Sequence, residues 1–277
     1  MRKLLSVLLI INTLLASCQE KMKEEKFVWS ASITAPKEYP IEVIRGLISN
    51  GESFVHFGTI YGVNNSGWGA PGGSMDNKTN SQLPNTLTFT WHSLVEDIYY
   101  TGTWELDTAY MTKVFKETYK NISRPLNLRM DDIVIGLGPK GKVVLWIDGE
   151  QTRVEVGSYQ AHDTIITAAD LSEDDAHMFK EGRTQRILNS NFYINDELKE
   201  KIKKEGYPDP KLYTTYQSKF NWKLQVSWPK PLYDTRIFYY NGEFEAIKDK
   251  ESIFFKNKRA VPQRLAINYI DNEKKED

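Results

Sequence analysis

The stretch DDIVIGLGPKGKVVLWIDG, residues 131–149, contains the strongest indication of the fold. Residues 143–147 (VVLWI) are apolar at every position, which is typical of a central strand that is covered on both faces. A further strand is expected near 131–136, and Asp148-Gly149 favours a tight hairpin turn into residues 152–156. The stretch therefore predicts a β-hairpin inside a buried sheet.

The link between these strands, Gly136 to Lys142 (GLGPKGK), matches the pattern G-x-G-x-x-G of dinucleotide-binding loops. A phosphate-binding loop must open a helix, because the free amides at the helix N-terminus hold the anion. Here the residues that follow predict a strand. We therefore expect a tight turn at Pro139-Lys140, and no nucleotide as a partner.

Other segments have the alternation of apolar and polar residues that predicts half-buried strands. The clearest is 220–228 (FNWKLQVSW), in which five apolar residues alternate with four polar ones. The same period occurs at 27–33, 87–91 and 265–269. Further strands are expected near 41–48, 53–61, 98–104 and 235–240.

Helices are predicted at few places, each after a residue that favours a helix N-cap. They are expected at 107–119 after Asp107, at 172–180 after Ser172, and at 195–205 after Asn195. The fold class that follows is mainly β with α+β character at the margins. We expect an antiparallel β-sandwich-like globule with about three peripheral helices.

The N-terminus resembles a bacterial lipoprotein signal. A basic start, 1–3 (MRK), precedes an apolar run, 4–15, that is too short to span a bilayer. Leu15-Ala16-Ser17-Cys18 then resembles a lipobox, which implies cleavage before Cys18 and acylation of that residue. Several acyl chains hold a protein firmly on a membrane. A plain secretory signal and a buried N-terminal helix stay open as alternatives.

The expected domain organisation follows from this signal. Residues 1–17 form the signal peptide, 18–26 the lipidated Cys18 with a charged tether, 27–270 a β-rich globular domain, and 271–277 a charged tail. A break between two lobes is possible near 160–190. Cys18 is the only cysteine, so no disulfide forms within the chain. Gln19, where an inner-membrane retention signal has Asp, favours the outer membrane, on either its periplasmic or its surface side.

Composition excludes one class of partner. Residues 1–17 contain two of the 36 basic and none of the 37 acidic residues, so the remaining chain has a formal net charge of −3. Without a basic excess, we do not expect nucleic acid as a partner.

Trp68 is the candidate binding residue, because it lies in the loop-like stretch 64–74 (NNSGWGAPGGS). An exposed tryptophan among glycines can stack on a sugar or insert into a protein partner. The structural alternative, which is favoured, is that Trp68 folds back over the sheet as a plug.

The sequence predicts neither a metal site nor a catalytic site. The four histidines, His56, His92, His162 and His177, have no metal-ligand spacing. The stretch 76–80 lacks the glycine and glutamate of a calcium loop. There is no G-x-S-x-G motif, and no spacing selects a carboxylate pair. We therefore expect no cofactor and no catalytic residue.

Several segments together resemble one family. They are Trp29-Ser30-Ala31, Ala35 to Pro40, Trp91 before Asp97 to Tyr100, and above all the run Asp132 to Gly141 that leads into the strand ending at Trp146. In these segments the chain is similar to the DUF2931 family of predicted bacterial lipoproteins. The family has no established activity, so the resemblance implies no catalytic residue.

Three functional hypotheses remain. The first is a non-enzymatic outer-membrane lipoprotein that binds an envelope protein or glycan. The second, since some members of the family are similar to immunity lipoproteins, is a protein that neutralises a periplasmic lipase toxin of a type VI secretion system. The third is a hydrolase of envelope or polysaccharide substrates, which requires a concave cleft with two carboxylates, or with His162 or His177 beside a carboxylate.

Overall fold

A computed structural model describes residues 25–72, 74–121, 125–225, 227, 229, 232–247 and 258–269. The predicted signal peptide, Cys18 and the charged tail lie outside these residues, so their predictions stay untested.

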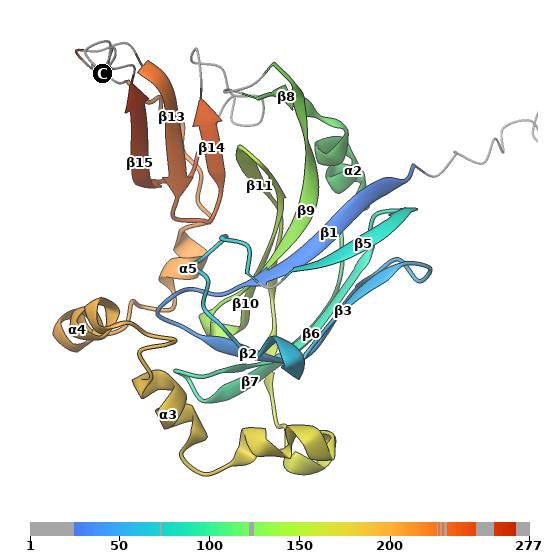
Figure 1. Ribbon diagram of the computed structural model, residues 1–277, viewed down its shortest axis with the longest axis vertical. Coiled ribbons are helices and arrows are strands. Elements are labelled where there is room, and N and C mark those ends of the chain that lie inside the picture. Colours follow the sequence, from blue (N-terminus) through green and yellow to red (C-terminus); the bar gives the residue numbers. More distant parts are fainter. Residues whose placement is uncertain are drawn as a thin grey trace, which may run out of the picture.

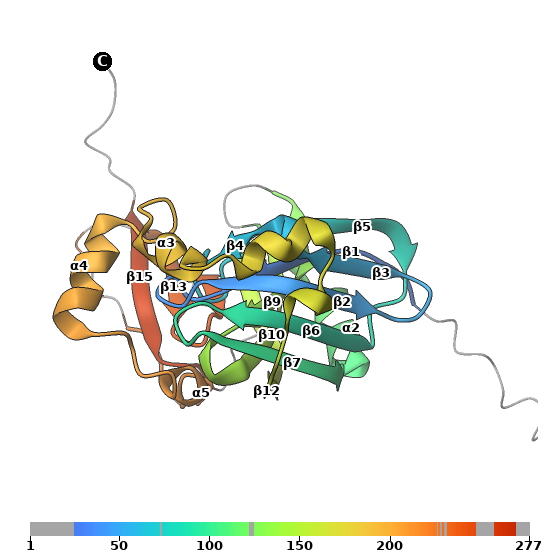
Figure 2. The same ribbon diagram turned by 90° about the horizontal axis from the view of Figure 1, so that it is seen from below.

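Two sheets, of nine and six strands in the described residues, confirm the mainly β prediction (Figure 1). The larger sheet has the order β15 (Pro262–Tyr269), β13 (Leu232–Tyr239), β14 (Phe244–Ile247), β11 (Thr152–Gln160), β10 (Lys142–Gly149), β9 (Asn127–Leu137), β1 (Phe27–Thr34) and β5 (Ser74–Ser81), and β8 (Thr118–Lys120) pairs with β9. The smaller sheet has the order β12 (His162–Thr164), β7 (Ile98–Glu105), β6 (Thr86–Ser93), β2 (Ile41–Ser49) and β3 (Phe54–Gly58), and β4 (Val63–Asn64) pairs with β2. Figure 2 shows the smaller sheet in front of the larger one.

The hairpin predicted from residues 131–149 forms the middle of the larger sheet. Leu145 and Ile147 belong to the main core between the two sheets. Val144 and Trp146 belong to a second apolar cluster on the opposite, outer face. The prediction that this strand is covered on both faces is therefore confirmed.

The glycine-rich link between β9 and β10 is a hairpin turn, as predicted. Residues Pro139–Gly141 form a single 3₁₀ turn, η2, in which Lys140 has a positive φ of 56°. The backbone N–H of Gly138 donates to the carbonyl of Lys142 at 2.7 Å. The turn leads into β10, and no helix follows it.

One pair of strands departs from the antiparallel prediction. Strand β1 pairs in parallel with β9, with Ile33 opposite Ile135, and pairs in the antiparallel sense with β5 on its other side. Alternation of apolar residues shows which face of a strand is buried but not its direction. The sheets are therefore mostly, rather than wholly, antiparallel.

Two of the three predicted helices form, although the first ends at Lys116 rather than near 119, where β8 begins instead, and the third has a different geometry. Asp107 caps α2 (Thr108–Lys116) and Asn195 caps α4 (Asp196–Glu205), each by accepting a backbone N–H. The segment after Ser172 is the 3₁₀ helix η4 (Glu173–Phe179). The chain also forms α3 (Arg183–Asn189), α5 (Leu212–Thr215), η1 (Thr59–Tyr61) and η3 (Ala168–Asp170). Among the helices of the described ranges, none has the length and apolar composition that crossing a bilayer requires.

The prediction of a strand at 220–228 is wrong. Phe220 makes one isolated bridge with Arg259, and the described residues that follow it up to 227 belong to no strand. Trp222 and Leu224 are nevertheless half-buried against the main core, while Asn221, Lys223 and Gln225 are exposed. An extended segment that lies on a core has the same alternation as a strand, although its backbone has no partner strand.

Candidate functional site

A pocket of about 470 Å³ opens on the larger sheet, where β9, β10 and β11 meet β13 and β14. Its size is in the range of small-molecule sites in proteins. The charged residues of its lining are Arg129, Asp131, Asp148, Glu150 and Arg153, and the apolar ones include Leu128, Phe238 and Phe244.

Strand register explains why these side chains lie together. Asp148 of β10 is opposite Asp132 of β9 and Arg153 of β11, and Arg153 is opposite Phe244 of β14. Residues directly opposite each other on paired strands project from the same face. Phe238 of β13 is opposite Phe244, so one row of side chains crosses five strands on the outer face.

A β-bulge adds one more carboxylate to this face. Asp132 is opposite Asp148 and Met130 is opposite Gly149, which leaves Asp131 as the extra residue on β9. Met130 and Ile133 both belong to the main core. The two aspartates between them therefore both face outward. Bulges commonly redirect a side chain in this way beside functional sites.

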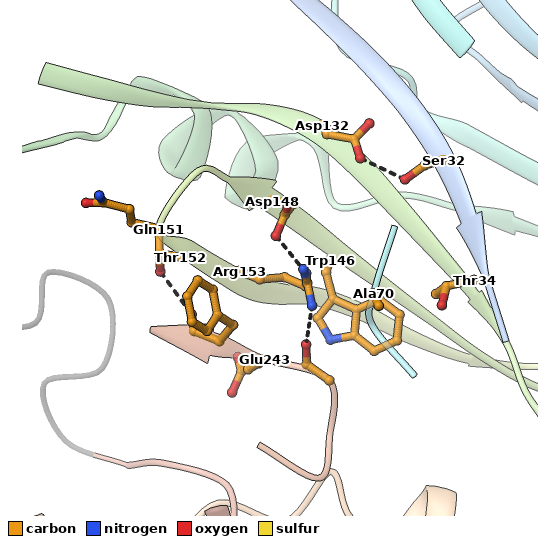
Figure 3. A network of polar contacts seen from close by, with 12 residues as sticks. Ser32, Thr34, Ala70, Asp132, Trp146, Asp148, Gln151, Thr152, Arg153 and Glu243 are labelled. Carbon is orange, nitrogen blue, oxygen red and sulfur yellow. Dashed lines mark hydrogen bonds and ion pairs between the residues drawn. The ribbon is translucent and has the colours of Figure 1, made fainter. Parts of the chain in front are cut away.

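The floor of the pocket is an ion pair that is fixed in position (Figure 3). Arg153 Nε lies 2.7 Å from Asp148 Oδ1, and its Nη1 donates to the carbonyl of Gly242 at 3.2 Å. Asp132 accepts hydrogen bonds from the hydroxyls of Ser30 and Ser32, each at 2.7 Å. These two aspartates are therefore held by the protein itself.

Burial raises the proton affinity of two carboxyl groups in the pocket. Burial raises the pKa of Asp148 to about 6, although Arg153 opposes the shift, and Asp132 and Asp131 add to it. Burial, followed by the charge of Asp132, also raises the pKa of Asp131. The lining contains three carboxyl groups, of Asp131, Asp148 and Glu150, and two arginines.

The apolar wall of the pocket comes from the C-terminal strands. Phe238 and Phe244 stack with their ring centroids 4.7 Å apart. The guanidinium carbon of Arg264 lies 3.9 Å from the centroid of Phe238. With its faces occupied by these neighbours, Phe238 has only its edge left for a ligand.

Trp68 lies on the predicted loop, between β4 and β5, and covers another part of the same outer face. Its ring is 5.1 Å from that of Trp146 and 5.3 Å from that of Tyr213. The indole also packs over Gly136 and Gly138, where an added Cβ would lie 3.0 and 3.2 Å from it. Trp68 does not line the pocket, and its role as a binding residue stays a prediction.

Comparison with known families identifies most of the chain. Residues 16–209 match the model of a family described as a protein of unknown function, DUF2931. The chain belongs to the DUF2931 family. No curated protein and no solved structure matches the chain. In this DUF2931 protein, the charged lining of the pocket lies within the matched residues, while Phe238 and Phe244 lie outside them.

The histidines of this DUF2931 protein lie outside the pocket. His56, His162 and His177 are exposed. His92 is buried, with Nε2 2.9 Å from Asp97 Oδ1, its ring stacks on Tyr99, and burial lowers its pKa. Within the described ranges no group of three or more histidine, cysteine or acidic side chains is arranged to hold a metal.

The sequence did not predict the residues of the pocket, although it contains a partial signal for them. Two successive aspartates, Asp131 and Asp132, precede an apolar strand, and Asp148 ends the strand that pairs with it. Adjacent polar residues break the alternation of a strand and so indicate a bulge. Nothing in the sequence indicates that Phe238 and Phe244 complete the site.

A second cluster of charged side chains, beside the pocket, fastens the C-terminal strands to β11. The backbone N–H of Glu155 donates to Glu243 at 3.0 Å, and Lys219 Nζ lies 2.7 Å from the same carboxylate. Asn241 donates to Glu155 at 3.2 Å. Burial raises the pKa of Glu155 to about 7, and the charge of Glu243 adds to this shift, while Lys219 and Lys142 oppose it.

This shift makes stability depend on pH. The folded protein binds the Glu155 proton more tightly than the unfolded chain, whose pKa is near 4.5, so the stabilisation is present at pH 4.5 and is lost as pH rises through about 7. In urea unfolding at pH 5 and pH 8, Glu155→Gln should lose less stability between the two values than the wild type. Part of the decline in stability should persist in Glu155→Gln, because protonated Asp148, whose pKa is raised to about 6, also stabilises the folded protein at pH 5. Glu105→Gln, at an exposed position, should leave the decline unchanged; an equal decline in all three proteins would contradict this assignment.

Proposed function

We propose that this DUF2931 protein is an outer-membrane lipoprotein that is anchored through acylated Cys18. It binds an envelope protein or glycan without catalysis. The observation that carries the proposal is the charged pocket on the outer face of the larger sheet. Leu15-Ala16-Ser17-Cys18 supports the anchor, and the charged stretch up to Lys26 supports a tether that keeps the folded domain off the lipid.

Binding is favoured over catalysis by the state of the carboxylates. Asp148 is fixed by Arg153, and Asp132 is fixed by two serine hydroxyls. Groups that are held in this way orient a ligand well, because their own conformations are already set. The immunity hypothesis uses the same surface, with a toxin as the protein partner, and a toxin gene beside this one would support it.

One observation favours the hydrolase hypothesis as a second candidate. Two carboxylates, of Asp131 and Asp148, lie in one pocket, and the pKa of Asp148 is raised to about 6, which suits a general acid near neutral pH. Turnover of an envelope polysaccharide that Asp148→Asn abolishes would establish this candidate and exclude the non-enzymatic one.

The test of the proposal is photo-crosslinking in living cells. A photoreactive residue at Asn127, which is exposed at the pocket, should give one discrete crosslinked product. The same residue at Thr103, exposed on the smaller sheet, is the matched control and should not give this product. The product should disappear when Cys18→Ser prevents acylation, and this variant should leave the membrane fraction. A product from both positions, or membrane retention of Cys18→Ser, would contradict the proposal.

A further inference from the structure

The pocket contains two opposite charges that do not pair with each other. Arg129 and Asp131 are two residues apart on β9, and both line the pocket. Two residues along a strand span about 6.6 Å. No ion pair joins the two side chains, and within the described part of the chain neither forms a hydrogen bond or ion pair with another side chain, apart from the hydrogen bond of Asp131 to its own backbone. Each is therefore available to a ligand.

We infer that this pocket binds an α-amino-acid head group, with the ligand carboxylate on Arg129 and its ammonium on Asp131. This inference rests on the pocket that carries the proposed function, and it names a ligand class for that pocket. A guanidinium matches a carboxylate with two parallel hydrogen bonds, and a carboxylate accepts from an ammonium group. A zwitterion that carries both groups on one carbon fits between the two side chains.

The surroundings favour a zwitterion over a simple ion. A polyanion would meet Asp131, Asp148 and Glu150, while a simple cation would meet Arg129. A ligand ammonium would also offset the repulsion between Asp131 and Asp132. The Asp148–Arg153 pair on the floor offers polar contacts to the rest of the ligand.

Two sources can supply this head group, a free amino acid or a peptide in which the group projects from a side chain. Glutamine represents the first, and γ-glutamylalanine, whose α-ammonium and α-carboxylate are both free, represents the second. Isothermal titration of the full chain in detergent should show saturable binding of at least one of them. Saturation by glutamine alone assigns the site to free amino acids, and tighter binding of γ-glutamylalanine assigns it to the peptide.

Ligands that lack one charge test the two contacts. N-acetylglutamine lacks the ammonium, and glutaminamide lacks the carboxylate. Each should bind about tenfold more weakly than glutamine or worse, which corresponds to roughly 1.4 kcal/mol for one charge-assisted contact.

Two variants test the assignment of each charge. Arg129→Gln should lose the preference for glutamine over glutaminamide but keep the preference over N-acetylglutamine. Asp131→Asn should show the reverse pattern. Both positions are exposed, so the variants should fold, and Thr103→Val is the control that keeps both preferences.

The inference is overturned if neither ligand binds saturably, or if both variants keep both preferences. Its failure is distinguishable from failure of the proposed function. A specific crosslink from Asn127 without zwitterion binding overturns only the ligand class. Zwitterion binding without any crosslinked partner overturns the proposal of an envelope protein or glycan as the partner, and it leaves the pocket as a small-molecule site.

Discussion

Replacing Trp146 with alanine should lower the free energy of unfolding by about 3–5 kcal/mol, the usual cost of removing a buried tryptophan. The side chain is fully buried, and its Nε1 donates to the carbonyl of Asn241 at 3.1 Å. Gly136 and Gly242 make room for it, since a Cβ at either position would lie 2.4 or 2.6 Å from the indole. Trp146 thereby joins β10 to the turn between β13 and β14, and its removal would leave a cavity at this junction.

Urea unfolding followed by circular dichroism measures this loss. Phe192→Ala removes a large aromatic ring that is 86% exposed, and it should change stability by no more than about 0.5 kcal/mol. Trp146→Phe should retain much of the stability, since the ring volume is largely kept. A loss for Trp146→Ala no greater than that for Phe192→Ala would show that the outer apolar cluster does not hold the sheet together.

Replacing Arg183 with methionine should cost about 3 kcal/mol. Arg183, the first residue of α3, donates from both terminal nitrogens to the carboxylate of Glu42 on β2, each at 2.5 Å. The Glu42 side chain is 4% exposed, so the variant leaves a buried charge without its partner. Breaking such a pair costs more than the pair contributes, because the remaining charge has lost both water and its counter-ion.

A double variant separates the contribution of the ion pair from the cost of leaving Glu42 buried without a partner. Glu42→Leu combined with Arg183→Met replaces both partners with apolar side chains, and it should recover stability to within about 1 kcal/mol of the wild type. Lys203→Met breaks an exposed pair with Glu200, separated by 3.8 Å, and should cost less than about 0.5 kcal/mol. If the double variant were as unstable as Arg183→Met, an unpaired Glu42 would not be the cause.

The helical segment that links β12 of the smaller sheet to β13 of the larger one is held by specific contacts. Besides Arg183, the Tyr193 carbonyl accepts from Asn65 at 2.6 Å, and the Pro208 carbonyl accepts from Tyr39 at 2.5 Å. The ring of Tyr213 packs on Trp68. The chain thereby returns to the outer face of the larger sheet and places Phe238 and Phe244 beside residues that precede them by about a hundred positions. The pocket depends on this return path.

Local sequence was sufficient for the elements whose environment repeats with the strand or helix period. The apolar run at 143–147, the turn at Pro139-Lys140 and the helix caps Asp107 and Asn195 are all confirmed. These features depend on neighbours within a few residues, such as a capping carboxylate or a turn glycine. The mainly β fold class follows from them.

Tertiary structure alone decided the remaining features. The extended segment at 220–225 has the alternation of a strand, but its place on the core leaves it without a partner strand. The parallel pairing of β1 with β9 and the wall of Phe238 and Phe244 join residues far apart in the sequence. Hydrophobic periodicity records whether a side chain is buried and not what covers it, so it predicted the sheets without their order and did not indicate the pocket.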